Sequence, residues 1–144
     1  MSVKVAKSAG FCFGVKRAAD KIAEAEKTAG NERIFTLGHL IHNPTYNKRL
    51  EEKRIFSIGV EDVEKIVASA GEDSPVRLFL RAHGIPKNEE ARLRKMEEEN
   101  KFFKCVDCTC PYVKKIHKIA SECSSDDNIF ILMGSESHPE VIGI

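Results

Sequence analysis

The stretch GVKRAADKIAEAEKTAGNERIFTLG, residues 14–38, decides the fold because it contains the two patterns of an α/β protein. Residues 14–28 are apolar at the i, i+3, i+4, i+7 and i+8 positions, which predicts a helix with one buried stripe. That stripe consists of Val15, Ala18, Ala19, Ile22 and Ala23. The short apolar run IFTLG (34–38) follows it and predicts a buried strand.

The same alternation of short apolar runs and longer amphipathic segments continues along the chain. Apolar runs predict strands at 3–7, 34–38, 55–59, 76–82, 103–107 and 128–134. Helical patterns occupy 14–28, 61–70, 86–99 and 112–123, with a weaker one at 43–53. Pro86 and Pro111 stand where helices begin, a position that tolerates a missing N–H. We therefore expect an α/β fold in which repeated strand–helix units form parallel-sheet lobes.

The composition and the apolar runs indicate which kinds of partner the protein binds and in which compartment it works. The 144 residues are 42% apolar and 31% charged and carry a formal net charge of +1, which gives no support for a strongly basic nucleic-acid surface. The longest apolar runs, such as 128–134, are far too short to span a bilayer. The first residues lack the apolar core of a signal peptide. We therefore expect a cytoplasmic protein that binds neither nucleic acid nor membrane.

Reactive side chains follow most of the predicted strands. They are Cys12, His39, His42, His83, Cys108, Cys110, His138 and Glu140. Because ligands of parallel sheets bind beyond the carboxyl ends of the strands, we expect these side chains to form one rim. Its thiolates suit a soft metal or an iron–sulfur cluster, and its imidazoles, when protonated, suit a phosphate or diphosphate. In a dry site Glu140 would be able to donate a proton.

The cysteines allow more than one interpretation. Five is an odd number, and in a reducing compartment the default is free thiols, metal ligands or a catalytic thiol. Cys105, Cys108 and Cys110 would form a zinc module if a distant histidine completed the ligand set. A thioredoxin-like motif and an α/β interaction domain without metal remain further alternatives. Cys123 continues the apolar stripe of the last helix, which favours a packing role.

Five short motifs occur in the order and at the approximate spacing of one enzyme family. They are GFCFGVKRA (10–18), IHNP (41–44), AHG (82–84), DCTCPYVKKIH (107–117) and SHPEV (137–141). On these motifs the whole chain closely resembles the 4-hydroxy-3-methylbut-2-enyl diphosphate reductase family, whose reaction is the last step of the non-mevalonate isoprenoid pathway.

The resemblance implies a function and a set of site residues. In that family a [4Fe-4S] cluster is held by three cysteines from three α/β lobes around a central site. The hydroxyl of an allylic diphosphate is removed reductively to give isopentenyl and dimethylallyl diphosphate. Cys12 and Cys110 match two cluster ligands, whereas Cys108 departs from the family pattern. The diphosphate-binding histidines are matched by His42, His83 and His138, and the proton-donating acid by Glu140. A ferredoxin or flavodoxin is the implied electron donor.

The length of the chain limits these expectations. Family members are roughly twice as long, so we expect this chain to be the N-terminal portion and to be inactive by itself. Residues 1–108, with the N-terminal strand, would form the first lobe, and residues 109–144 would begin the second. The third lobe and the third ligand cysteine would be absent.

Overall fold

One parallel four-stranded sheet forms the centre of the computed structural model, which describes residues 2–125 and 127–144. The strand order is β2-β1-β3-β4. The register pairs Leu37 with Ile58 and Leu80, and Leu80 with Asp107, so the strands end level at one edge. The bounds are β1 Arg33–Leu37, β2 Phe56–Ile58, β3 Val76–Leu80 and β4 Phe103–Asp107. The α/β class and the four central strands expected from the sequence are therefore confirmed.

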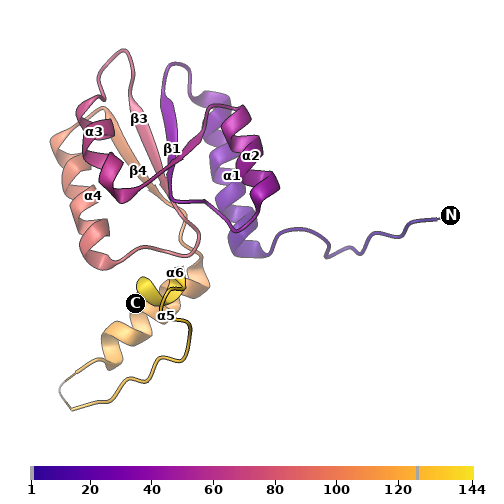
Figure 1. Cartoon of the computed structure of the whole chain (residues 1–144), viewed down its shortest axis with the longest axis vertical. Coiled ribbons are helices and arrows are strands. Elements are labelled where there is room, and N and C mark those ends of the chain that lie inside the picture. The colour runs from indigo at the N-terminus through magenta and orange to yellow at the C-terminus, as the bar shows by residue number, and fades with distance from the viewer. Residues whose placement is uncertain (1, 126) are drawn as a thin grey trace.

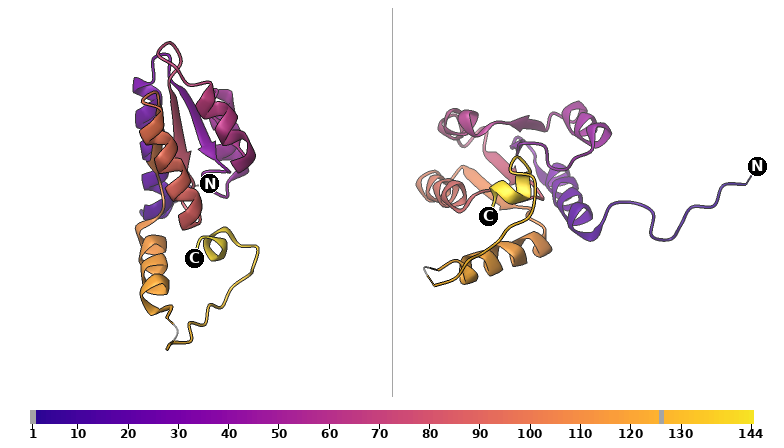
Figure 2. Two further views of the ribbon diagram at one scale, coloured as in Figure 1. Left: turned by 90° about the vertical axis from the view of Figure 1, so that its left-hand side faces the viewer. Right: turned by 60° about the horizontal axis from the view of Figure 1, so that its bottom comes forward.

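Helices cover both faces of the sheet (Figure 1). Two pack on one face and two on the other, whereas the last two lie beyond the carboxyl ends of the strands (Figures 1 and 2). The first face is covered by α1 (Phe13–Thr28) and α2 (Pro44–Glu52). The second face is covered by α3 (Val63–Ala68), which follows a 3-10 turn at Val60–Asp62, and by α4 (Lys87–Glu99). Beyond the sheet lie α5 Pro111–Cys123 and α6 Pro139–Ile142. None of the helices in the described ranges combines the length and apolarity needed to cross a membrane.

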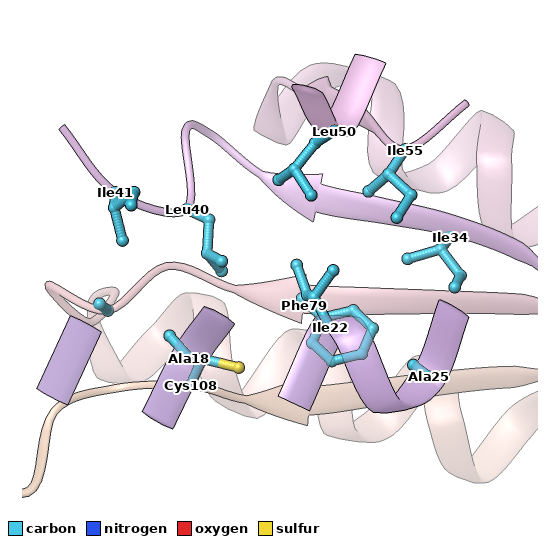
Figure 3. Packing of buried hydrophobic residues seen from close by; sticks show 11 residues of the cluster. Ala18, Ile22, Ala25, Ile34, Leu40, Ile41, Leu50, Ile55, Phe79 and Cys108 are labelled. Atoms are coloured by element: carbon cyan, nitrogen blue, oxygen red, sulfur yellow. The ribbon is translucent and has the colours of Figure 1, made fainter. Parts of the chain in front are cut away.

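The alternation of side chains along β3 separates two hydrophobic clusters. Phe79 faces α1 and packs in the first cluster beside Ile22 and Ile34 (Figure 3). Its neighbours Leu78 and Leu80 point to the opposite face and pack in the second cluster with side chains of α3 and α4. Successive residues of a strand point to opposite faces, so an apolar strand such as β3 serves both clusters.

The strand order reverses between β1 and β3. From β1 the chain moves outward to β2, and from β3 it moves outward in the other direction to β4. Doubly wound sheets bind ligands in the crevice outside the carboxyl ends of the strands at this reversal. The loops that follow β1 and β3 are therefore the first place to look for a site.

Two predicted strands are wrong. Residues 3–7 pair with none of the described strands, and Val3 and Val5 are exposed on a segment that leads away from the sheet (Figure 1). Residues 128–134 also form no strand, and the pairing that the described residues show near them is a bridge between Ser125 and Asn128. A strand needs a neighbour that accepts its backbone hydrogen bonds, and neither segment lies beside one among the described residues. The prediction of two lobes, 1–108 and 109–144, is not tested by this arrangement and stays a prediction.

Candidate functional site

Backbone hydrogen bonds join the loops that follow β1, β3 and β4. The Ala82 N–H donates to the Leu40 carbonyl at 3.2 Å, and the Cys110 N–H donates to the Ala82 carbonyl at 2.8 Å. These bonds continue the contacts between neighbouring strands past the ends of the strands themselves. They fix three short loops in a row, and those loops carry His42, His83 and Cys110.

Three of the four histidines expected at the rim meet at the reversal of strand order. The ring centroids of His42 and His83 are 4.3 Å apart. The ring of His138 lies 6.3 Å from His42 and 6.2 Å from His83. His39, in the same loop as His42, is exposed, and the ring contacts within the described ranges join the other three histidines without it. Three imidazoles this close can surround one anion when protonated.

His138 and Glu140 come to the site on α6, a short helix that the sequence patterns did not predict. His138 is its N-cap, and the Glu140 backbone N–H donates to His138 Nδ1 at 3.2 Å. The half-buried carboxylate of Glu140 is close enough to His83 to favour protonation of that ring. The carboxylate and the three imidazoles therefore belong to one electrostatic unit.

The fold favours the neutral form of His83. Burial is the main cause of the lowering of its pKa below the ordinary value of 6.5, and the neighbouring His42 adds to it. Its Nδ1 atom is buried and has no hydrogen-bond partner among the described residues. A negative charge next to this ring would favour its protonated form.

The lowered pKa of His83 gives a stability prediction. The unfolded chain binds a proton at His83 more tightly than the folded chain does. The stability that neutral His83 contributes to the fold is therefore complete above pH 6.5 and is lost as the pH falls through the lowered pKa. We expect the urea midpoint of the wild type to fall more steeply between about pH 7 and pH 5 than that of His83→Gln. The variant His39→Gln, which changes an exposed histidine, should follow the wild type, and equal slopes for all three proteins would contradict the prediction.

Cys12 and Cys110 each stand at the start of a helix. Cys12 is the N-cap of α1 and is exposed, and Cys110 is the N-cap of α5 and is partly buried. Gly14, in the first turn of α1, packs directly against Cys110, because a Cβ atom at Gly14 would lie 2.5 Å from Cys110 Sγ. Any larger residue at position 14 would have to displace the Cys110 side chain. Helix N-termini favour thiolates through their partial positive charge.

Basic side chains of α1 hold the loop that carries Cys110. Arg17 Nη1 donates to the Thr109 carbonyl at 3.1 Å, and Lys21 Nζ donates to the Asp107 carbonyl at 2.7 Å. Within the loop, the Thr109 N–H donates to Asp107 Oδ1 at 2.7 Å, and Lys114 forms an ion pair with the same carboxylate. These ties, like the role of Gly14, were missed from the sequence. Of the basic pair Lys16 and Arg17 that follows Cys12 in the sequence, only Arg17 contributes to these ties.

The other cysteines do not join this site. Cys105 packs in the second hydrophobic cluster and Cys108 in the first, on opposite faces of the sheet. Burial raises the pKa of Cys105 to about 12 and that of Cys108 to about 11, so both stay protonated thiols. The zinc module of Cys105, Cys108 and Cys110 is therefore wrong. The departure at position 108 is explained by packing, because the Cys108 side chain is fully buried.

Thiol labelling should separate the two kinds of cysteine. At about pH 8 we expect the accessible thiols of Cys12, Cys110 and Cys123 to react rapidly. Cys105 and Cys108 should react only as fast as the sheet opens, because they are buried as well as protonated. Peptide mapping of the labelled chain by mass spectrometry measures each rate. Rapid labelling of Cys108 would contradict its place in the core.

The residues present fit part of a cluster site. Cys12 and Cys110 offer two thiols at neighbouring helix N-termini, which suits two thiolate ligands of an iron–sulfur cluster. Within residues 2–125 and 127–144, no group of three or more histidine, cysteine, aspartate or glutamate side chains is placed to hold a metal ion. A cluster bound here would need at least one ligand from outside this set.

Fold and site together define a doubly wound α/β protein whose strand-end rim combines thiols at helix N-termini with a group of imidazoles. Residues 3–144 match the family described as LytB protein, and the chain belongs to that family. It is 39% identical over 144 residues to a 4-hydroxy-3-methylbut-2-enyl diphosphate reductase of Caldanaerobacter subterraneus, and 42% identical over 144 residues to one of Clostridioides difficile.

Solved structures give the same relationship. A structure of (E)-4-hydroxy-3-methyl-but-2-enyl diphosphate reductase, the terminal enzyme of the non-mevalonate pathway, superposes with a TM-score of 0.71 at 37% identity over 98% of this chain. The corresponding reductase from Plasmodium falciparum superposes with a TM-score of 0.74 at 28% identity over 95% of this chain.

The match covers only part of each relative. The chain spans 46% and 47% of the Caldanaerobacter and Clostridioides proteins, and 45% and 39% of the two solved chains. This coverage is consistent with the expectation that the chain corresponds to one portion of the enzyme. The activity of the whole enzyme is therefore a proposal for this chain.

Proposed function

We propose that this chain provides the part of a 4-hydroxy-3-methylbut-2-enyl diphosphate reductase that binds the diphosphate and delivers a proton. The observation that carries the proposal is the meeting of His42, His83 and His138 at the reversal of strand order, beside Glu140 and in a loop network that includes Cys110. Membership of the LytB family supports it.

The three imidazoles bind the diphosphate group in this proposal. Their rings lie within 4.3–6.3 Å of one another, a spacing that lets one anion contact all three. His83 is neutral in the free chain because burial and His42 lower its pKa. It takes up a proton as the anion arrives, because the negative charge favours the imidazolium. The diphosphate would thereby be recognised by charge and hydrogen bonds together.

Glu140 supplies the proton that allows the substrate hydroxyl to leave as water. Its backbone is tied to His138, so the carboxyl group is positioned by the same residue that helps to bind the diphosphate. A carboxylic acid next to a bound anion keeps its proton more readily than one in water, which suits a general acid.

Cys12 and Cys110 are two thiolate ligands of the proposed iron–sulfur cluster. When bound, the cluster supplies the electrons for the reduction and a Lewis-acidic iron for the hydroxyl. Gly14 and the ties from Arg17 and Lys21 to the 107–109 loop hold the Cys110 thiol in place. A ferredoxin or flavodoxin is the proposed electron donor, and the cytoplasm is the proposed compartment.

A chimera tests the function. In it, this chain replaces the matching 144 residues of the Clostridioides difficile reductase, and the product is purified and reconstituted with iron and sulfide without oxygen. Reduction of 4-hydroxy-3-methylbut-2-enyl diphosphate by a viologen dye is then measured beside the parent enzyme and this chain alone.

We expect the chimera to hold a cluster and to turn over, and this chain alone to do neither. Chimeras with Cys12→Ser or Cys110→Ser should lose the cluster absorbance, whereas Cys123→Ser, at an exposed thiol away from the site, should retain it. A folded chimera with a cluster but without turnover would refute the proposed activity. Retention of the cluster by both ligand variants would refute the proposed ligands.

A further inference from the structure

His117 lies against two glycines. It is on α5, seven residues after Cys110, and residues at this spacing share one face of a helix. The His117 Cε1 atom is 2.8 Å from the position that a Cβ atom on Gly84 would occupy. Its Cε1 and Nε2 atoms are each 3.1 Å from the corresponding position at Gly143. A side chain at either position would therefore press on the imidazole ring.

Both glycines belong to elements that carry site residues. Gly84 follows His83 in the turn after β3, and Gly143 is the C-cap of α6, the helix whose N-cap is His138. Gly84 has φ +81°, so its backbone alone favours glycine. Gly143 has φ −75° and ψ −14°, which any residue adopts easily. At Gly143 the missing side chain therefore matters for the contact with His117 and not for the backbone.

The Nε2 side of the His117 ring packs against Gly84 and Gly143. This nitrogen is buried and has no hydrogen-bond partner among the described residues. Buried polar atoms are usually paired, so among the described residues it is the close approach to Gly84 and Gly143, and not a hydrogen bond, that locates this edge of the ring. The ring thus acts as a spacer between the His83 turn and α6.

We propose that His117 is a positioning residue that sets the distance between the turn carrying His83 and the helix carrying His138 and Glu140. The consequence for diphosphate binding rests on the proposed function. His138 reaches the other two histidines only because α6 lies beside the His83 turn, with ring distances of 6.2 and 6.3 Å. Without the His117 ring, α6 loses the side chain that separates it from the turn.

A double-mutant cycle in this chain tests the contact. The variants are His117→Ala, Gly143→Ala and the double variant, and the probe is inorganic pyrophosphate, titrated by calorimetry. We expect each single variant to weaken binding by about tenfold, because small displacements of binding groups are costly. The double variant should bind no more weakly than His117→Ala, since the added methyl group then has room. His117→Phe, which keeps a ring, should restore most of the affinity.

Additive effects of the two substitutions on pyrophosphate affinity would overturn the proposal. It would also be overturned if the variants had lower urea midpoints but bound pyrophosphate, when folded, as tightly as the wild type. The exposed variant His39→Ala is the control and should bind as the wild type does. If the wild type binds no pyrophosphate, the diphosphate part of the proposed function fails. The cycle is then read from the NMR shifts of the His83 ring, where non-additive changes support the positioning role and additive changes overturn it.

Discussion

Replacing Glu140 with glutamine in the Clostridioides chimera should lower turnover by roughly 10²–10⁴-fold, the usual contribution of a general acid. Glutamine has nearly the same shape but cannot release the proton that the leaving hydroxyl needs. The backbone N–H of residue 140 still donates to His138, so α6 keeps its N-cap. The cluster absorbance and the affinity for pyrophosphate should therefore change little, and single-turnover measurements should show the loss in the chemical step.

A nearby acid provides the control for this prediction. Glu136 is exposed in the loop before α6, and Glu136→Gln changes the same net charge without touching the histidines. It should turn over at the rate of the parent chimera. A Glu140→Gln chimera with full turnover would show that the proton comes from elsewhere. One that loses pyrophosphate affinity as strongly as turnover would show that Glu140 serves binding.

The central sheet could be predicted from the sequence because its strands find their neighbours within the chain. Residues 34–38 and 76–82 have apolar runs bounded by turn residues, and they pair with each other over Arg33–Leu37 and Val76–Leu80. Residues 3–7 and 128–134 have similar apolar character, but no strand of the described part of the chain lies beside them. An apolar pattern indicates that a segment suits a half-buried strand, but it does not indicate which strand would pair with it.

The site was predictable in part for a related reason. Parallel strands of equal register end at one edge, so residues that follow separate strands, such as His42 and His83, meet without any sequence signal that links them. The short helix α6 and the packing of His117 against Gly84 and Gly143 were not predictable. They depend on where α5 leaves the sheet, which is set by tertiary contacts and not by local periodicity.

The second large effect is expected from Phe79→Ala, measured as the free energy of unfolding in urea. Phe79 is 1% exposed on β3, and its ring packs on Ile22 of α1 and beside Ile34 of β1 (Figure 3). Truncation of a buried phenylalanine leaves a cavity and typically costs about 3–5 kcal/mol. Domains typically have only about 5–15 kcal/mol of total stability, so a large fraction of it should be lost.

The edge strand provides a matched control for the same chemical change. Phe56 on β2 is 48% exposed, and Phe56→Ala should cost clearly less than Phe79→Ala, by about 2 kcal/mol or more. Phe79 is also two residues before Arg81, whose Nε donates to the Gly84 carbonyl at 3.0 Å in the turn that carries His83. If β3 anchors the site in this way, the pyrophosphate affinity of Phe79→Ala should fall together with its stability, whereas Phe56→Ala should bind like the wild type. Equal losses of stability in the two variants would mean that the cluster between α1 and the sheet is not the centre of the fold.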